Sequence, residues 1–153
     1  AVKRQLTGVY DPRWMLPMAE TLKELGSEHV WIMHGADGLD ELTTTGPSQV
    51  AELKNGTIRE FEITPEEVGL ERVSLEQIKG GTPEENAEAL LALLNGEKGP
   101  YRDVTLLNAG AAILIGGKCE TVQEGITLGA EAIDSGRALK AFEEMKRITN
   151  LSN

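Results

Sequence analysis

The chain has 153 residues, of which 40% are hydrophobic and 26% charged, a composition typical of one soluble globular domain. Its formal charge of −10 opposes binding to a phosphate backbone, so we expect no nucleic-acid partner. No apolar run is long enough for a membrane span and no secretory signal is apparent, so we expect a cytoplasmic protein with no membrane partner.

The first part of the chain predicts a βαβ unit. Residues 4–10 alternate like a strand and lead into Asp11-Pro12, an acidic N-cap followed by a proline suited to the first helical position. Apolar residues at helical spacing then continue to Gly26, which predicts the end of the helix. Residues 29–33, HVWIM, form an apolar run typical of a strand covered on both faces, so the two strands should pair in parallel.

The next part predicts a hairpin. SQVAEL and TIREFEI, within residues 48–63, flank an Asn55-Gly56 pair, the strongest short signal for a tight hairpin turn. Residues 64–70, TPEEVGL, resemble a single capped turn. The predicted fold class is therefore α/β with a mixed parallel and antiparallel sheet.

The remaining residues predict helices that flank this sheet. Thr82, Pro83 and Glu85 form a capping box, and this helix should end at Gly96. A second helix, from Asp103, is rich in alanine and glycine and should be buried. Two further helices are expected at residues 120–134 and 136–149, where small residues permit close helix contacts: Gly125, Gly129 and Ala132. With no linker or repeat, residues 1–153 read as one domain.

The segment HGADGLDEL, residues 34–42, carries the main candidate site because ligands of open α/β sheets bind where strands end. Adjacent Asp40 and Glu41 offer hard oxygen ligands of the kind that Mg²⁺ takes together with waters and substrate phosphates. An alternative is that the acidic loop is only the solvated start of a helix, where negative charge favours the helix dipole. An EF-hand calcium loop fits poorly, since this segment does not supply oxygen donors at alternate positions or a glutamate at the twelfth. Spacing alone leaves the first two interpretations open.

Other polar residues carry less specific signals. His34 is either a ligand contact or a hydrogen-bonded structural residue, and Gly80-Gly81 either an anion nest or part of the capped helix start. Asn108 predicts a core polar link or the edge of a site. Cys119, the single cysteine, excludes an internal disulfide and is expected to be a small buried hydrophobe. No catalytic side chain is predicted.

Four segments, in this order and spacing, resemble the carboxy-terminal part of anthranilate phosphoribosyltransferases: RQLTGVYDPRW, HGADGLDEL, KGGTPEENA and RDVTLLNAGAAI. The resemblance implies an α/β catalytic domain of mixed sheet and magnesium-dependent transfer of a phosphoribosyl group from phosphoribosyl pyrophosphate (PRPP) to anthranilate, in tryptophan biosynthesis. It also implies that Asp40 and Glu41 bind Mg²⁺, and that the full-length enzyme is a homodimer.

The family's GTGGD-type and KHGN-type segments and its anthranilate-contacting arginine do not occur in these 153 residues. We therefore expect the chain to be the carboxy-terminal portion of the catalytic domain, without the amino-terminal helical domain, and to be inactive alone. Two alternatives remain open: a related enzyme of the pyrimidine nucleoside phosphorylase type, and a non-catalytic module derived from this fold.

Overall fold

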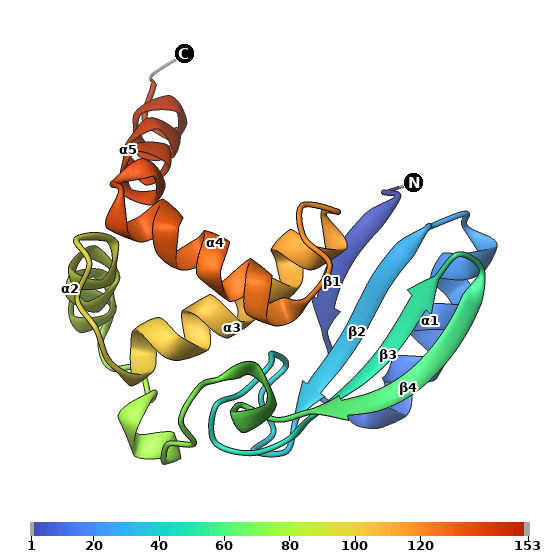
Figure 1. The fold of residues 1–153 in the computed structure, drawn as a ribbon. Coiled ribbons are helices and arrows are strands. Elements are labelled where there is room, and N and C mark those ends of the chain that lie inside the picture. Colours follow the sequence, from blue (N-terminus) through green and yellow to red (C-terminus); the bar gives the residue numbers. More distant parts are fainter. Residues whose placement is uncertain (1, 152–153) are drawn as a thin grey trace.

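The computed structural model describes residues 2–151 (Figure 1). The first half contains β1 (Arg4–Gly8), the 3-10 turn η1 (Pro12–Trp14), α1 (Met15–Glu24), β2 (His29–Gly35), β3 (Ser48–Lys54) and β4 (Thr57–Ile63). The second half contains the 3-10 turns η2 (Glu66–Val68) and η3 (Leu75–Gln77), followed by α2 (Pro83–Leu94), α3 (Pro100–Ile115), α4 (Val122–Asp134) and α5 (Arg137–Thr149).

The four strands form one mixed sheet in the order β1-β2-β3-β4. β1 pairs with β2 in parallel and β3 with β4 antiparallel, as the sequence predicts. The structure adds an antiparallel pair between β2 and β3. The hairpin turns at Asn55 and Gly56, whose φ angles of 50° and 78° are those that an Asn-Gly turn supplies. The predicted fold class is confirmed.

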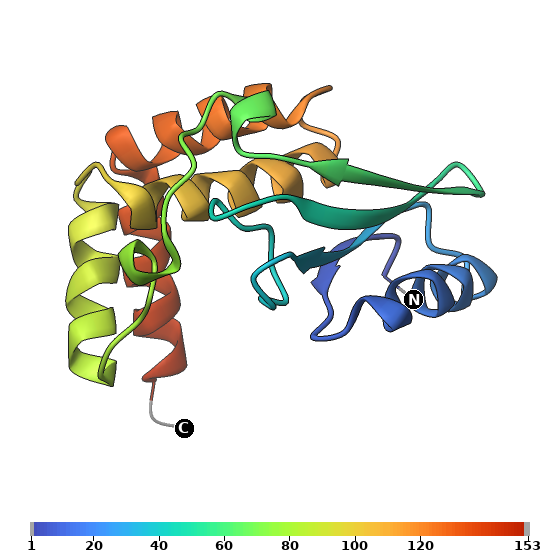
Figure 2. The same ribbon diagram turned by 90° about the horizontal axis from the view of Figure 1, so that it is seen from below.

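The sheet lies between α1 on one side and α3 with α4 on the other (Figure 2). β2 is the central element, because Val30 and Ile32 pack toward α1 while Trp31 and Met33 pack toward α3. All four side chains are buried. The continuous apolar run of β2 therefore serves two core clusters, one on each face, and the expectation of a strand covered on both faces is confirmed.

α3 and α4 cross closely because both carry glycine at the contact. A Cβ atom on Gly125 would lie 2.3 Å from the backbone oxygen of Gly110. At Gly129 the nearest atom would be the flexible end of Leu106, at 3.2 Å, so this contact is looser. Ala132 is half-buried. The prediction of close packing is thus confirmed most clearly at Gly125.

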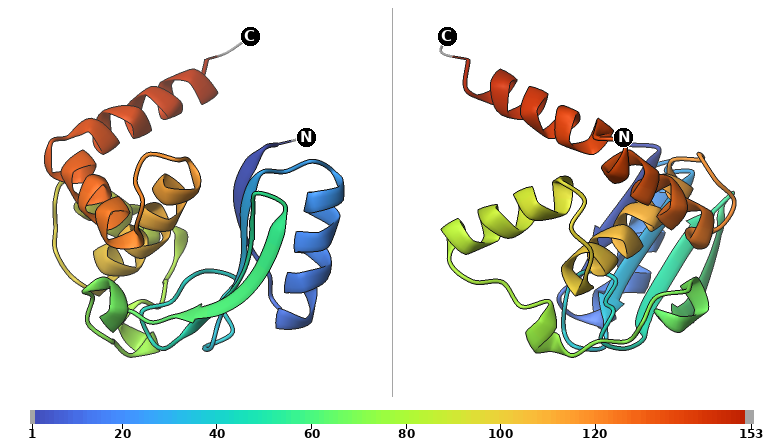
Figure 3. Two further views of the ribbon diagram at one scale, coloured as in Figure 1. Left: turned by 45° about the vertical axis from the view of Figure 1, so that its right-hand side comes forward. Right: turned by 60° about the vertical axis from the view of Figure 1, so that its left-hand side comes forward.

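α2 and α5 lie away from the sheet, at the far end of α3 and α4 (Figure 3). A third apolar cluster joins them, with Leu93 and Leu94 of α2 packed near Ile133 of α4 and near Leu139 and Phe142 of α5. None of the helices within residues 2–151 combines the length and apolar character needed to cross a bilayer.

Some element boundaries differ from the sequence predictions. Asp11 caps a 3-10 turn, with its carboxylate accepting from the Arg13 amide at 3.0 Å, and the α-helix proper begins only at Met15. α3 begins at Pro100 rather than Asp103, because a proline after Gly99 occupies its first position. The turn η3 was not predicted.

Candidate functional site

The acidic loop, residues 36–47, connects β2 to β3 at the edge where β1 and β2 end (Figure 1). No helix follows it, so the interpretation as the solvated start of a helix is wrong. Asp40 and Glu41 are both exposed. Within residues 2–151, no hydrogen bond or ion pair engages either carboxylate, although the loop around them is densely bonded. The two side chains are therefore free to bind a ligand.

Asp37, the third acidic residue of the loop, has a structural role. Its carboxylate accepts hydrogen bonds from the hydroxyls of Thr43 and Thr45, at 2.6 and 2.7 Å, and from the Leu39 amide at 3.2 Å. Partial burial raises the pKa of Asp37, but these hydrogen bonds outweigh it and leave the pKa below its ordinary value. Gly35 leaves room for this carboxylate, since a Cβ there would lie 2.6 Å from its Oδ1 atom.

Asn108 of α3 joins the loop to the helical layer. Its Oδ1 accepts from the Leu42 amide at 3.0 Å, and its Nδ2 donates to the Leu42 carbonyl at 2.8 Å. The same Nδ2 also donates to the Val104 carbonyl at 3.0 Å, one turn back along α3. Of the two roles predicted for Asn108, that of a polar link is confirmed. The residue after the acidic pair is thus fixed by both of its backbone groups.

Glu41 and Asn108 also line one open groove of about 600 Å³ between the ends of β1 and β2 and the side of α3. Its other walls are largely apolar: Leu6, Met33, Val104, Ala109 and Ala112, with Tyr101 and Thr105. Asp40 does not line this groove, although the adjacent Glu41 does. Asn108 therefore serves as the edge of a hollow as well as a link.

The donor set of this loop fits Mg²⁺. Among residues 2–151, no group of three or more His, Cys, Asp or Glu side chains converges to hold a metal, so this chain offers two carboxylates and no closed cage. Mg²⁺ keeps several waters and is bound by one or two carboxylates together with substrate phosphates. An exposed Asp-Glu pair without other partners matches that requirement.

The other polar residues singled out from the sequence have structural roles. The Nδ1 atom of His34 lies 2.8 Å from the Val9 carbonyl, a hydrogen bond that ties β2 to the segment after β1. The Gly81 amide donates to Asn86 at 2.8 Å and the Thr82 amide to Glu85 at 2.7 Å. Because both amides are used within the chain, Gly80-Gly81 provides the start of α2 and not an anion nest.

The expectation that Cys119 is buried is wrong. The residue lies after the end of α3 and is half-exposed, with its thiol 3.3 Å from the Thr121 carbonyl. Partial burial and the nearby Glu124 carboxylate raise the pKa of the thiol, so its surroundings disfavour the thiolate that a nucleophile requires.

Sequence reasoning missed a buried polar cluster near the start of β2. Glu52 of β3 is only 3% exposed, and its carboxylate binds the side chains of His29 at 3.0 Å, Trp31 at 2.9 Å and Arg59. Burial raises the pKa of Glu52, but these three partners outweigh it and lower the pKa. Since both carboxylate oxygens of Glu52 are bonded to side chains of the sheet, the cluster is structural.

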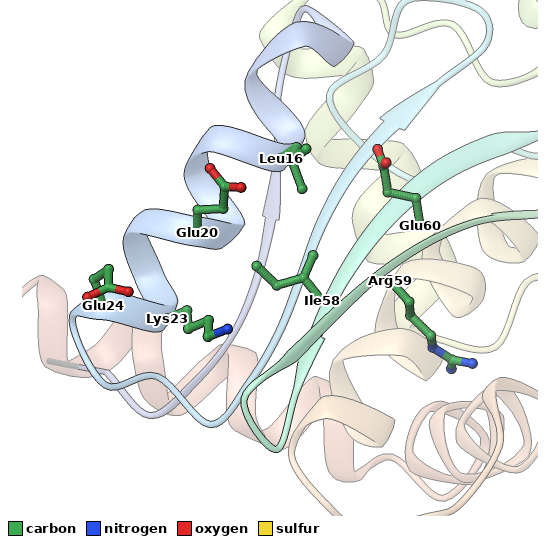
Figure 4. A pocket seen from close by; sticks show the side chains of 7 residues that line it. All are labelled: Leu16, Glu20, Lys23, Glu24, Ile58, Arg59 and Glu60. Atoms are coloured by element: carbon green, nitrogen blue, oxygen red, sulfur yellow. The ribbon is translucent and has the colours of Figure 1, made fainter.

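A second open hollow, of about 660 Å³, lies between α1 and β4 (Figure 4). Its walls carry charges of both signs: Glu20, Lys23, Glu24, Arg59 and Glu60, with Leu16 and Ile58. It includes none of the acidic-loop residues. The hollow that accompanies the acidic pair is therefore the groove beside α3.

The mixed sheet between helical layers, with the acidic loop at its edge, defines an α/β domain. Residues 1–139 match the family described as "Glycosyl transferase family, a/b domain", and the chain belongs to this family. The two relatives described next both carry the name anthranilate phosphoribosyltransferase, so the resemblance stated from the sequence is confirmed.

The chain is 55% identical over 152 residues to the anthranilate phosphoribosyltransferase of Parvibaculum lavamentivorans, covering 99% of this chain and 45% of the relative. The enzyme of Mesorhizobium japonicum is 54% identical, with 97% and 44% covered. The chain thus spans less than half the length of the curated relatives it matches.

Solved structures agree. The anthranilate phosphoribosyltransferase of Thermus thermophilus matches with a TM-score of 0.81 and 44% identity, covering 90% of this chain and 40% of the other. The Saccharomyces cerevisiae enzyme in complex with PRPP and Mg matches with a TM-score of 0.82 and 29% identity over the same shares.

Proposed function

We propose that the complete protein is a magnesium-dependent anthranilate phosphoribosyltransferase of tryptophan biosynthesis. It would transfer a phosphoribosyl group from PRPP to anthranilate, giving N-(5-phosphoribosyl)anthranilate and pyrophosphate. The observation that carries the proposal is the exposed pair of Asp40 and Glu41 at the sheet edge, whose carboxylates have no hydrogen-bond partner among residues 2–151. It is supported by the identity to named enzymes and by a neighbour of the same fold in complex with PRPP and Mg.

In this proposal, Asp40 and Glu41 hold the cation and the rest of the loop keeps them in place. When bound, Mg²⁺ neutralises the negative charge that develops on the departing pyrophosphate. The bond from the ribose carbon to pyrophosphate breaks and a bond to the anthranilate nitrogen forms, so no side-chain nucleophile is required. Positioning and electrostatics then supply most of the acceleration.

We further propose that residues 1–153 are the carboxy-terminal portion of the α/β catalytic domain. Support comes from the 45% share of the relative that the chain covers, and from the absence of GTGGD-type and KHGN-type segments in its sequence. The substrates would then be bound largely by a part of the protein outside these residues. The complete enzyme would be cytoplasmic and a homodimer, and sedimentation of the complete protein tests the homodimer.

The decisive experiment replaces both carboxylates by amides, Asp40→Asn with Glu41→Gln, in the complete polypeptide. Turnover of PRPP with anthranilate should fall by about 100-fold or more, because both protein ligands of the cation are weakened. The concentration of Mg²⁺ that gives half-maximal turnover should rise as well. Unchanged turnover and Mg²⁺ dependence would refute the metal assignment. Phosphorolysis of pyrimidine nucleosides by the unsubstituted protein, without anthranilate turnover, would refute the substrate assignment.

A second experiment tests the division of the domain. The 153-residue chain alone, assayed with Mg²⁺, anthranilate and PRPP, should give no product above background. Adding the amino-terminal portion of the Parvibaculum lavamentivorans relative as a separate chain should restore some turnover. Clear product from the 153 residues alone would contradict the proposed division, and no recovery with the added portion would favour a non-catalytic module.

A further inference from the structure

We propose that Asn108 is a positioning residue for the acidic pair, and that its two hydrogen bonds to the backbone of Leu42 set the affinity of Asp40 and Glu41 for a divalent cation. The inference rests on the proposed function, since it takes the acidic pair as the cation ligands. It assigns to α3 a part in metal binding, although no residue of α3 would touch the metal.

The geometry fixes the peptide group that follows Glu41. This group contains the Leu42 amide, which donates to Asn108 Oδ1 at 3.0 Å, and the Leu42 carbonyl on the next peptide receives Asn108 Nδ2 at 2.8 Å. Two successive peptide planes are therefore held by one side chain. The Leu42 side chain is fully buried in the core between the sheet and α3, which adds a third restraint at the same residue.

The backbone is also restrained on the other side of the pair. The Asp40 carbonyl lies against Gly8, where a Cβ would come within 1.4 Å of the oxygen, and the Glu41 carbonyl lies 3.1 Å from the place a Cβ would take on Gly35. Asp37 cross-links the two ends of the loop through Thr43 and Thr45. The two exposed carboxylates thus extend from a backbone that has little freedom.

This restraint of the backbone matters because the two side chains that it positions are exposed. Neither carboxylate has a hydrogen-bond partner within the described residues 2–151 that would orient it before the cation arrives. Some residues orient the metal ligands without touching the metal themselves. Removing such a residue typically lowers metal affinity or activity by about 10- to 100-fold. For this loop, Asn108 is the side chain that acts on Leu42, the residue after the pair, while Asp37 accepts from the amide of Leu39, the residue before it.

The chain contains a matched control. Asn95 donates from Nδ2 to the Leu91 carbonyl at 2.8 Å, one turn back, as Asn108 does to Val104. Asn95 lies at the end of α2 and has no bond to the loop. Asn95→Ala therefore removes the same amide and the same local hydrogen bond as Asn108→Ala, but leaves Leu42 in place.

The test measures Mn²⁺ binding by electron paramagnetic resonance in the complete protein, with Mn²⁺ as the probe for Mg²⁺. Asn108→Ala should weaken Mn²⁺ binding by about 10-fold or more, while Asn95→Ala should change it less than about 2-fold. Asn108→Leu, which fills the space but makes no hydrogen bonds, should behave like Asn108→Ala. In activity assays, half-saturation with Mg²⁺ should shift by a similar factor, with the KM for anthranilate little changed.

Folded Asn108→Ala and Asn108→Leu proteins that bind Mn²⁺ like Asn95→Ala would overturn the inference. The Asp40→Asn, Glu41→Gln protein separates this failure from that of the proposed function: if it too binds Mn²⁺ normally, the pair itself is not the metal site. Hydrogen exchange of the unsubstituted protein without metal adds a test that needs no variant. The Leu42 amide should be strongly protected, and exchange as fast as in an unstructured peptide would also overturn the inference.

Discussion

Gly8, at the end of β1, lies in direct contact with the backbone of Asp40: a Cβ atom on Gly8 would come within 1.4 Å of the Asp40 carbonyl oxygen. Backbone atoms cannot swing aside as a flexible side chain can. Gly8→Ala must therefore displace either the strand or the acidic loop. We expect a loss of about 3 kcal/mol in the free energy of unfolding, measured by denaturant titration.

Gly46 provides the control within the same loop. A Cβ there would meet only Ala36 Cβ, at 3.8 Å, which is ordinary contact. Gly46→Ala should change the free energy of unfolding by less than about 1 kcal/mol. Equal effects of the two substitutions would show that contact with Asp40 is not what requires glycine at position 8.

Asp37 should make the stability of the loop depend on pH. Its pKa in the folded protein lies below that of the unfolded chain, so ionised Asp37 stabilises the folded state at pH values above about 4. As the pH falls through the folded pKa, the carboxylate is protonated and this contribution is lost. Asp37→Asn should therefore cost about 1 kcal/mol at pH 7, and the difference from the unsubstituted protein should shrink below about pH 4. Urea titrations at several pH values measure it, and a difference that grows on acidification would contradict the assignment.

The buried Glu52 cluster should contribute to stability and not to the proposed chemistry. Glu52→Gln keeps the shape but loses the charge that His29, Trp31 and Arg59 surround, and should cost about 1–3 kcal/mol. Arg59→Gln should cost less than about 1 kcal/mol because the Arg59 side chain is 68% exposed. Thermal unfolding compares the two, and a larger effect at Arg59 would contradict the order. Mn²⁺ affinity should be unchanged in both variants.

The crossing of α3 and α4 should tolerate a methyl group at one glycine and not at the other. Gly125→Ala would place a Cβ 2.3 Å from the Gly110 oxygen and should destabilise the protein by about 2–3 kcal/mol. At Gly129 the neighbour is the Leu106 side chain, and alanine also favours a helix, so Gly129→Ala should be within about 1 kcal/mol of neutral. Denaturant titration distinguishes them, and similar losses at both positions would refute the argument.

Much of the fold follows from local sequence patterns. Three features are specified by residues that are adjacent in the sequence, and the structure contains all three: the apolar strand β2, the Asn55-Gly56 turn and the Thr82 capping box. The boundaries were less predictable where two signals compete. At Pro12, a good cap and a proline begin a 3-10 turn, and the α-helix proper begins only at Met15.

The candidate metal ligands could be predicted from the sequence, but the residues that hold their loop and the neighbouring sheet in place could not. An adjacent Asp and Glu after a strand are visible in the sequence, whereas the partners of Leu42 and Glu52 are not. Asn108 is 66 positions from Leu42, and His29 and Trp31 are 23 and 21 positions from Glu52. Only the folded arrangement of strands and α3 brings these residues together, and no short pattern encodes such pairs.

The three acidic residues of the loop are divided between two tasks. Asp37 is half-buried and hydrogen-bonded, while Asp40 and Glu41 are exposed and their carboxylates make no hydrogen bond within the described part of the chain, residues 2–151. Substitutions at these residues should therefore be tolerated differently during evolution. A lineage that no longer needs the reaction can change the exposed pair freely and still produce an intact domain, whereas a change at Asp37 would be felt in every descendant, active or silent.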